Sequence, residues 1–295
     1  MAFSSEILDS SIRHYTDLIG DQILYVAYSG GVDSSVLLQR LVALYGNRVK
    51  AIHIEDDRQQ RLFCLKQCTL LKIQCIVVDG RNITRPNDVR RLKHQIFARY
   101  GGLIFMGHHQ DDVVENCLFR FIAKGSVMPA ISPVVQYDNF TIIRPMIRIK
   151  KDDLINIAST CRYAYYESLY NSGNHCNRNI MRNDILPRLK SIHHNAAKNL
   201  YSVSCYYQQQ HNFIKDIVKR FYGDRIIYAE ISEFSCNSRC VLIRYWLSMR
   251  CNYFSPHKVI LHIVNNLAKK STWRYRLTAK YSVMKKSGYL YVMGL

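Results

Sequence analysis

The stretch Ser29-Gly30-Gly31-Val32-Asp33-Ser34-Ser35 decides how this chain is expected to fold. It follows directly on an apolar run, residues 23–28, that is typical of a buried strand, and it leads directly into a helical pattern over 34–44. Two glycines let a backbone approach a ligand closely, and the free N–H groups of a new helix attract anions. The stretch therefore predicts a phosphate-binding loop between a strand and a helix.

This loop differs from the Walker type, which requires Gly-Lys followed by Ser or Thr. It contains no lysine, and Asp33 would repel phosphate unless the carboxylate holds a Mg²⁺ ion that bridges to it. We therefore expect a different phosphate chemistry, with Asp33 as the metal ligand and the hydroxyls of Ser29 and Ser34 as further donors. A glycine-rich turn capped by Asp33 or Ser34 is the plain structural alternative.

Strand and helix patterns alternate through the first half of the chain, as they do in parallel sheets joined by helical crossovers. The predicted strands cover 23–28, 49–54, 74–78, 103–106 and 140–143, and the predicted helices cover 34–44, 58–71, 88–100 and 151–161. This alternation predicts an α/β fold with an open, mostly parallel sheet and helices on both of its faces.

The pattern becomes mainly helical after residue 195, with helices predicted over 195–222 and 238–249. Between 273 and 283, apolar residues alternate with Arg274, Arg276 and Lys280 among the polar ones, which predicts one strand with an apolar and a basic face. A turn over 285–288 would then lead into a second strand, 289–293. We expect two domains, 1–190 and 191–295, and the second is smaller, mainly helical and ends in a strand pair.

The charge balance indicates a polyanionic partner. The chain has 41 Lys and Arg against 22 Asp and Glu, a formal net charge of +19, and neutralising the phosphates of a nucleic acid releases its counterions. No run approaches the roughly 20 apolar residues that span a bilayer, and the N-terminal segment does not resemble a secretory signal. Ten cysteines without a Cys-x-x-Cys pair indicate reduced thiols. We expect a cytoplasmic protein that binds nucleic acid and no membrane.

A second polar cluster, Gly-His-His-Gln-Asp-Asp-Val-Val-Glu at 107–115, follows the fourth predicted strand and opens a helix. Ligands bind at this carboxyl edge of open parallel sheets, so His109, Asp111 and Asp112 are candidates for proton transfer or metal binding. Asp112 and Glu115 also have the spacing of a capping box. A zinc site is disfavoured because no cysteine ligand lies nearby in the sequence.

The first motif resembles the pyrophosphate loop of the PP-loop ATPases, the N-type ATP pyrophosphatases with an adenine nucleotide alpha hydrolase-like fold. The second resembles the Gly-His-x-x-Asp-Asp-x-x-Glu segment of the tRNA(Ile)-lysidine synthases. That resemblance continues in order through Lys124-Gly125-Ser126, Arg144-Pro145-Met146-Ile147, Arg178-Asn179-x-x-Arg182 and Pro187. It covers about residues 20–190, and it implies the short, two-domain form of that family.

The resemblance implies an ATP-dependent carbon–nitrogen ligase. Such an enzyme cleaves ATP between the α and β phosphates and activates C2 of cytidine 34, in the CAU anticodon of an isoleucine tRNA, as an adenylate. The amine of free L-lysine then displaces AMP, and the lysidine that forms changes codon specificity from AUG to AUA. ATP, Mg²⁺, the tRNA and L-lysine are the implied cofactors and substrates, and no obligate protein partner is implied.

The same resemblance implies two groups of site residues. ATP and its Mg²⁺ would be bound by Ala27, Ser29, Gly30, Gly31, Val32, Asp33 and Ser34, and the reacting centre would hold His109, Asp111 and Asp112. An amine with a pKa near ~10.4 needs a base to attack at neutral pH, and His109 or Asp111 is the candidate. Arg178 and Arg182 lie four residues apart and could meet RNA phosphate or the carboxylate of lysine. Solvated surface arginines are the alternative.

Two segments depart from the pattern of this family. Residues 53–57 read His-Ile-Glu-Asp-Asp, where the family usually has a segment of the type His-x-His-Gly-Leu. Ser168 and Tyr170 replace an expected Asp and Ser. These departures concern the contacts to adenine and the lysine pocket, and they leave the phosphate loop unchanged.

Two other functions remain open at this point. A PP-loop enzyme that thiolates tRNA usually relies on reactive cysteines, and Cys117 is the thiol nearest to the candidate site in the sequence. A non-catalytic RNA-binding protein on a decayed ATPase scaffold is the second alternative, and the intact loop and the Asp111-Asp112 pair argue against it. In any of these proteins Arg274, Arg276 and Lys280 could position RNA through its phosphates.

Overall fold

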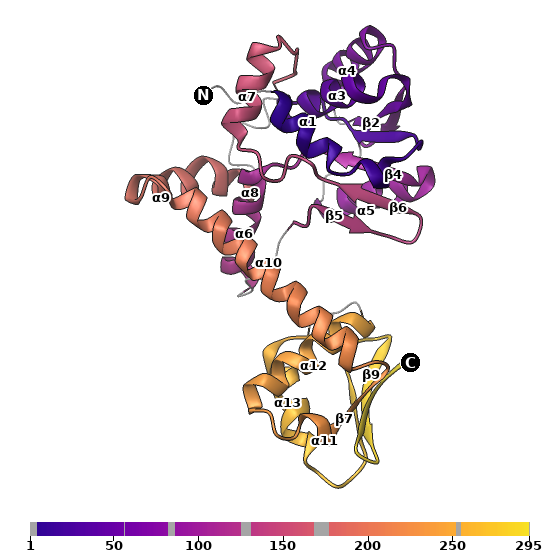
Figure 1. Cartoon of the computed structure of the whole chain (residues 1–295), viewed down its shortest axis with the longest axis vertical. Coiled ribbons are helices and arrows are strands. Elements are labelled where there is room, and N and C mark those ends of the chain that lie inside the picture. The colour runs from indigo at the N-terminus through magenta and orange to yellow at the C-terminus, as the bar shows by residue number, and fades with distance from the viewer. Residues whose placement is uncertain are drawn as a thin grey trace. The chain divides into compact units, whose positions relative to one another are not determined.

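The computed structural model describes residues 5–55, 57–81, 86–124, 131–167, 177–251 and 255–294. The chain forms two compact units, Met1–Cys205 and Tyr206–Leu295. Their boundary falls inside one long helix, α10 (Ala196–Phe221), which starts in the first unit and ends in the second (Figure 1). Each unit has an apolar core of its own.

The first unit is built on a six-stranded sheet with the order β3-β2-β1-β4-β6-β5. Its strands are β1 (Leu24–Ala27), β2 (Val49–Glu55), β3 (Cys75–Asp79), β4 (Gly102–Met106), β5 (Val134–Gln136) and β6 (Phe140–Ile143). All neighbours are parallel except at one edge, where the short strand β5 pairs antiparallel with β6. The predicted open, mostly parallel sheet is confirmed.

The strand order reverses beside β1. The chain runs from β1 outward to β2 and β3, and it then returns to place β4 on the other side of β1. The connections that leave β1 and β4 therefore diverge, and a crevice forms at the carboxyl ends of these two strands, which is where open α/β sheets bind ligands. Both motifs from the sequence follow directly on these strands.

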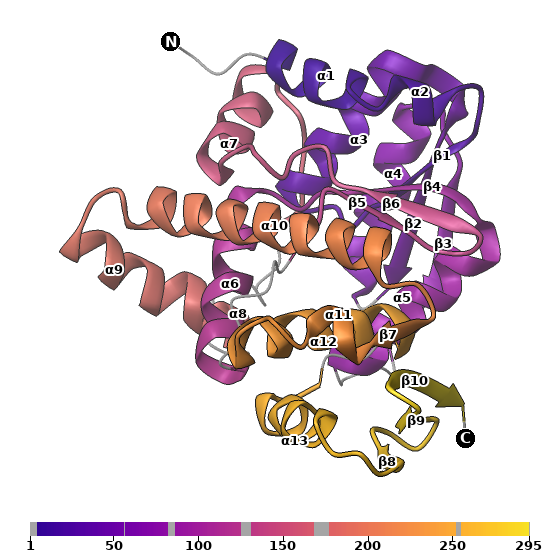
Figure 2. The ribbon, with the colours of Figure 1, turned by 60° about the horizontal axis from the view of Figure 1, so that its bottom comes forward.

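Helices cover both faces of this sheet (Figure 2). The helices that precede α10 in this unit are α1 (Ser5–Arg13), α2 (Thr16–Ile19), α3 (Val32–Tyr45), α4 (Arg58–Leu70), α5 (Pro86–Tyr100), α6 (Gln110–Lys124), α7 (Lys151–Thr160), α8 (Asn177–Ile180) and α9 (Leu186–Ile192), with a 3₁₀ turn at Gly46–Arg48 and a π-helical turn at Met181–Ile185. Side chains of β1 point alternately to the two faces of the sheet. Leu24 and Val26 pack in one cluster with residues of α1, α3, α4 and α7. Tyr25 and Ala27 pack in another cluster that includes Phe97 of α5.

The second unit is smaller and mainly helical, as predicted. Besides the end of α10 it contains α11 (Tyr228–Ile231), α12 (Cys236–Cys251), α13 (His257–Leu267), β7 (Arg225–Ile227), β8 (Trp273–Arg276), β9 (Tyr281–Lys286) and β10 (Tyr289–Gly294). The four strands form an antiparallel sheet with the order β7-β10-β9-β8. Trp246 is the largest fully buried side chain of this unit, and its indole N–H donates to the carbonyl of Gly223.

The single strand predicted over 273–283 is wrong. The chain turns after β8 and returns as β9, so two strands stand where the alternation indicated one. The hydroxyl of Thr278 accepts hydrogen bonds from the N–H groups of Lys280 and Tyr281 and closes the turn. The alternating pattern runs on through these residues, so periodicity alone could not reveal the turn. The predicted turn between the last two strands is present, with Ser287 and Gly288 at positive φ.

Candidate active site

The phosphate loop occupies the predicted place between β1 and α3, and Gly30 shapes it. This residue has a φ of +80°, which favours glycine, and a Cβ placed on it would lie 2.9 Å from the sulfur of Cys64 on α4. Gly31 is the N-cap residue of α3 in an extended conformation. The turn therefore requires glycine at position 30 for two independent reasons.

Hydroxyl groups hold the loop in this shape. The Ser34 hydroxyl accepts from the backbone N–H of Ser29 at 3.2 Å and donates to the carbonyl of Gly31 at 3.0 Å. The Ser35 hydroxyl donates to the carbonyl of Gly30 at 2.9 Å. Ser29 and Ser34 were expected to present their hydroxyls to a ligand, but in this structure the two hydroxyl oxygens lie 3.0 Å from each other. Both side chains thus preorganise the turn.

The second motif meets the first at Gly107, directly after β4. A Cβ at this position would lie 3.2 Å from the backbone carbon of Asp33 and 3.2 Å from the backbone nitrogen of Ser34. These distances are tighter than ordinary Cβ contacts, so glycine at this position favours the close approach of the two connections. The structure therefore brings the polar cluster at 107–115 against the first turn of α3.

His109 lies at the centre of this cluster and is 1% exposed. Its Nε2 is 3.7 Å from a carboxylate oxygen of Asp33 and 3.5 Å from one of Asp112, and its Nδ1 is 3.5 Å from one of Asp111. Among the described residues neither ring nitrogen has a partner with hydrogen-bond geometry. A buried polar group in this condition is uncommon outside functional sites, and here three carboxylates surround it.

Asp111 links the cluster to α7. Its carboxylate accepts a hydrogen bond of 2.9 Å from the backbone N–H of Lys151, the first residue of that helix. Burial by itself would raise the pKa of Asp111, but the contact with His109 and the bond from Lys151 outweigh it and hold this pKa at about 2. The group is therefore ionised near neutral pH and is a weak base, so His109 is the better of the two candidates for proton transfer.

Asp112 and Glu115 both face Arg182. The helix α6 begins at Gln110, so Asp112 stands at its third position and accepts from the backbone N–H of His109 at 2.9 Å, which is the N3 half of a capping box. The capping box predicted from the sequence had Asp112 at the N-cap position and Glu115 three residues later, so the structure shifts the box by three residues. The guanidinium of Arg182 donates to Glu115 at 2.7 Å and to Asp112 at 3.3 Å.

Arg182 was predicted as a ligand for RNA or lysine, and the structure gives it two carboxylate partners within the protein. It lies in the π-helical turn that follows α8. Arg178 lies on α8, but its side chain is outside the described part of the structure. The same holds for Gly125 and Ser126 and for the departing positions Ser168 and Tyr170.

Lys151 is the site residue that the sequence did not reveal. Its ammonium group lies 2.6 and 2.8 Å from the two carboxylate oxygens of Asp33. The loop has no lysine of its own, and this one arrives from α7, which begins 118 positions further along the chain. No local pattern marks such a residue, because it is the fold that brings the start of α7 to the start of α3.

Three helices thus begin at one place: α3 with its loop, α6 with the His109 cluster, and α7 with Lys151. The contacts of Lys151 with Asp33 and Asp111 tie them together. The N-terminus of a helix carries a partial positive charge and free N–H groups. This convergence makes the crevice suitable for a polyanion such as a triphosphate.

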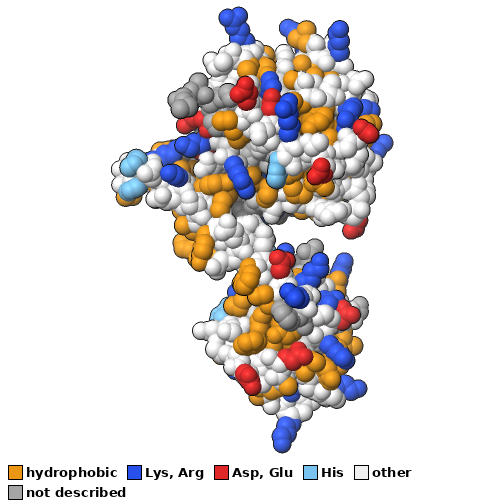
Figure 3. Space-filling view, viewed as in Figure 1, with side chains coloured by type: hydrophobic (Ala, Val, Ile, Leu, Met, Phe, Trp, Pro, Cys, Tyr) orange, Lys and Arg blue, Asp and Glu red, His pale blue; other side chains and the backbone are white. Residues whose placement is uncertain are grey.

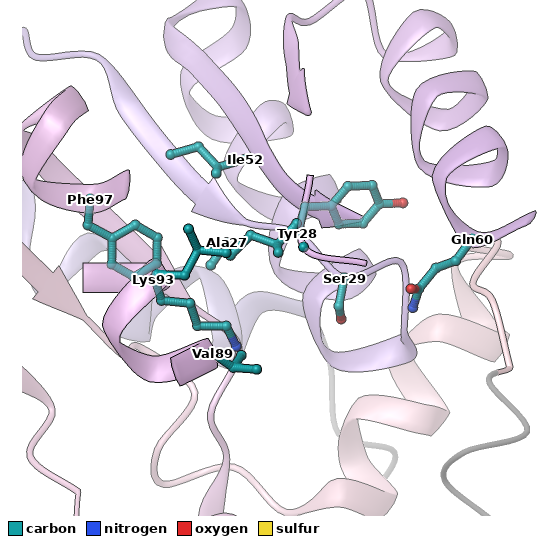
Figure 4. Close-up of a pocket in the computed structure, with 11 residues that line it drawn as sticks. Ala27, Tyr28, Ser29, Ile52, Gln60, Val89, Lys93 and Phe97 are labelled. Carbon is teal, nitrogen blue, oxygen red and sulfur yellow. The ribbon is translucent and has the colours of Figure 1, made fainter. Parts of the chain in front are cut away.

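A cavity of about 200 Å³ adjoins the loop. Ala27, Tyr28 and Ser29 line it, Ile52, Val89 and Phe97 are among its apolar side chains, and Lys93 and Gln60 are among its polar ones (Figure 4). Gly80 also lines it, and a Cβ there would lie 2.6 Å from the side chain of Ile54. A mostly apolar slot beside a phosphate loop suits a nucleobase. Of its lining, the sequence predicted Ala27 and Ser29.

Two of the residues at 53–57 that differ from the family pattern, Glu55 and Asp57, make contacts that hold the chain in place beside this cavity. Glu55 is 3% exposed, pairs with Arg61 at 3.2 Å, and accepts from Gly80 through its backbone carbonyl. Asp57 caps α4 and accepts a hydrogen bond of 2.8 Å from the hydroxyl of Tyr166. Asp56 lies outside the described residues.

The predicted RNA-binding face of the second unit is only partly as expected. Arg274 and Arg276 are exposed on β8, where their neighbours Trp273 and Tyr275 point to the core. Lys280 is exposed in the turn after β8 and so does not share a strand face with them. Lys and Arg side chains are spread over the visible surface of both units (Figure 3).

No helix in the described ranges is both long enough and apolar enough to cross a bilayer.

Known proteins are similar to this chain in sequence. The chain is 27% identical to the tRNA(Ile)-lysidine synthase of Histophilus somni (strain 129Pt) over 250 residues, which is 76% of this chain and 58% of that protein. It is 24% identical to the tRNA(Ile)-lysidine synthase of Francisella tularensis subsp. holarctica (strain OSU18), with 96% of this chain and 75% of that protein covered. The chain thus spans less than two thirds of the Histophilus relative.

The fold is also shared with a solved structure, the U34-tRNA thiolase NcsA from Methanococcus maripaludis with its [4Fe-4S] cluster. The TM-score is 0.56 at 18% sequence identity, and the match covers 70% of this chain and 78% of that chain. The family model for the PP-loop domain matches residues 5–189, which is more than half of the chain and includes every residue of the site described above in the first unit. This protein therefore belongs to the PP-loop family.

Proposed function

We propose that this protein is a tRNA(Ile)-lysidine synthase. An oxygen at C2 of cytidine 34 attacks the α-phosphorus of ATP, and pyrophosphate leaves. The amine of free L-lysine then attacks C2, AMP leaves with that oxygen, and one proton is lost from the amine. Relatives at 24–27% identity carry this name, and the convergence of three helix N-termini beside a base-sized cavity is the observation that supports it.

The first unit would bind ATP with the groups already described. Adenine would occupy the cavity beside Ala27, and the phosphates would lie over the loop residues Ser29, Gly30, Gly31, Val32, Asp33 and Ser34. Lys151 would move its ammonium group from Asp33 toward the phosphates, which carry more charge than one carboxylate. In this way α7 would supply the cation that the loop lacks.

Mg²⁺ fits the chemistry of Asp33. This ion prefers carboxylate oxygens, and it commonly takes one or two of them together with phosphate oxygens and water. The side chain of Asp33 is 26% exposed at the loop. Among the described residues no group of three or more His, Cys, Asp or Glu is placed so that it could hold a metal ion by itself, so the proposed ion would take its remaining ligands from phosphate and water. When bound, it would neutralise the charge of the triphosphate.

At the reacting centre we assign the proton transfer to His109. Its ring nitrogens are buried without hydrogen-bond partners among the described residues, and they lie beside the loop carboxylate. Asp111 and Asp112 would orient the ring and stabilise its charged form once it takes the proton from lysine. Arg182 would hold Asp112 in place, since it bridges that residue and Glu115.

The thiolation alternative finds little support in the geometry. Cys117, the thiol on which it rests, is 6% exposed on α6, and burial raises its pKa above the ordinary value. A buried protonated thiol is a poor nucleophile. The likeness to the thiolase structure concerns the fold alone.

The test is to incubate the purified protein with ATP, labelled L-lysine and an unmodified isoleucine tRNA that carries the CAU anticodon. Label is expected in the RNA only when ATP is present, with AMP and not ADP as the nucleotide product. A methionine tRNA with the same anticodon is the matched control, and it should remain unlabelled. Incorporation that does not depend on ATP, or release of ADP, would contradict the proposal.

A further inference from the structure

A second cavity, of about 160 Å³, is also lined by Asp111. Its walls come from the first turn of α6, the start of α7 and the connection between α9 and α10. Three lysines line it: Lys150, Lys190 and Lys198. Figure 3 shows Lys and Arg side chains beside the histidines at the tip of α9. Neither the nucleotide nor the proton transfer proposed above uses these lysines.

The charges in this cavity favour an anion. Within the described ranges no ion pair engages the ammonium groups of the three lysines, and all three side chains are exposed. The two carboxylates of the lining both interact with α7. Asp111 accepts a hydrogen bond from the backbone N–H of Lys151, and Asp152 lies in the first turn of α7, where a negative charge is favourable to the helix dipole. The N-termini of α6, α7 and α10 border the same cavity.

We propose that this cavity binds a backbone phosphate of the RNA beside the nucleotide that reacts. The proposal rests on the proposed function. Gln110 and Asp111 belong both to this cavity and to the motif around His109, so an anion held here lies next to the reacting centre. A base that reacts must leave its stack, and contacts to the flanking phosphates hold the strand while it does so.

The other anion that could enter is the carboxylate of the amino acid substrate. Three separate lysines and three helix N-termini exceed what one small carboxylate needs, whereas a phosphodiester in a single-stranded loop has several exposed oxygens. The lysines project from three different elements, which suits a strand that passes across the cavity. We therefore assign the site to RNA.

The experiment compares Lys190→Ala, Lys198→Ala and the double variant with Lys66→Ala, a control that removes an exposed lysine from α4. Binding of the CAU isoleucine tRNA is measured at several KCl concentrations, and ATP affinity and the KM of lysine are measured in parallel. Each single variant should lower the slope of log K against log salt by about 0.7, the value for one contact to a single strand. The double variant should bind RNA roughly tenfold more weakly at low salt. ATP affinity should not change.

Two results would overturn the assignment. An unchanged salt slope in the double variant would remove the cavity from the RNA interface. A raised KM for lysine with unchanged RNA affinity would assign the cavity to the amino acid instead. The wild-type protein separates this proposal from the broader one: if it binds the tRNA but forms no lysidine, the proposed function fails, while the salt slopes still decide whether the cavity holds phosphate.

Discussion

Asp33 places a negative charge in the loop where a triphosphate is expected to bind, and Lys151 neutralises it. The ammonium group lies within 2.8 Å of both carboxylate oxygens. Part of this pair is buried, so removing one partner leaves the other poorly compensated. In the proposed function Lys151 would therefore supply the positive charge that a loop lysine supplies in Walker-type sites.

Replacement of Lys151 by alanine should weaken ATP binding. A charge-assisted hydrogen bond to phosphate contributes about 1.5–3 kcal/mol, so the affinity should fall roughly tenfold to a hundredfold. Calorimetric titration with a non-hydrolysable ATP analogue measures the change. Lys151→Arg should retain most of the affinity. If the Lys151→Ala variant binds the analogue as tightly as the wild type does, the ammonium group of Lys151 has no phosphate contact.

Gly30→Ala should disrupt the loop, because alanine is strained at a φ of +80° and its Cβ would lie 2.9 Å from Cys64. We expect a loss of about 1–3 kcal/mol of stability and at least a tenfold loss of ATP affinity. Gly46→Ala is a matched control, since Gly46 also has positive φ but nothing lies within 4 Å of a Cβ there. The control should lose stability alone. Equal ATP affinities in both variants would contradict the assigned shape of the loop.

At the scale of elements, Asp111 joins two helices. It stands in the first turn of α6, and its carboxylate accepts a hydrogen bond from the backbone N–H of Lys151 at the start of α7. This bond caps α7, whose own N-cap residue, Lys150, makes no side-chain cap hydrogen bond. The backbone N–H of Gln110 in turn donates to Ile149. The starts of α6 and α7 are thus fixed to each other, and the side chains of His109 and Lys151 are positioned as one body.

Asp111→Asn should destabilise the first unit in a manner that depends on pH. The pKa of Asp111 is lowered from 3.8 to about 2, so its contribution is fully present above pH 4 and is lost as the pH falls toward 2. The shift corresponds to about 2 kcal/mol. Urea unfolding at neutral pH should show this difference between wild type and variant, and the difference should shrink below pH 4. A constant difference across this range would mean that the carboxylate charge is not responsible.

The elements that the sequence predicts well are those whose patterns are local. The five parallel strands follow apolar runs, and the two motifs mark the ends of β1 and β4. The contact between Lys151 and Asp33 escapes prediction because it depends on where α7 packs, and the cavity wall from α5 escapes it for the same reason. The turn after β8 escapes it because the apolar alternation continues through Thr278.

At the scale of the whole molecule, the two units divide the work as we propose it. The first holds the nucleotide and the reacting base, and the second carries the exposed arginines of β8. With a formal net charge of +19, the chain as a whole attracts RNA without regard to a particular face. A test of a specific face must therefore separate it from this general attraction.

Charge reversal at Arg274 and at Arg276, each alone, should weaken tRNA binding at low salt and reduce the salt slope by about 1. Arg225→Glu removes the same charge from β7, at the opposite edge of the sheet, and should leave the slope unchanged. Filter binding at several salt concentrations provides the measurement. Identical slopes for all three variants would show that β8 has no phosphate contact.

The proposed function requires the loop to hold ATP so that a nucleobase oxygen, and not water, takes up AMP. The most direct measurement uses ATP labelled in the α-phosphate with the isoleucine tRNA and no lysine. We expect label to become attached to the RNA and to be released as AMP when lysine is added, and Lys151→Ala should lower this transfer. Release of labelled AMP in the absence of RNA, or labelled ADP under any condition, would contradict it.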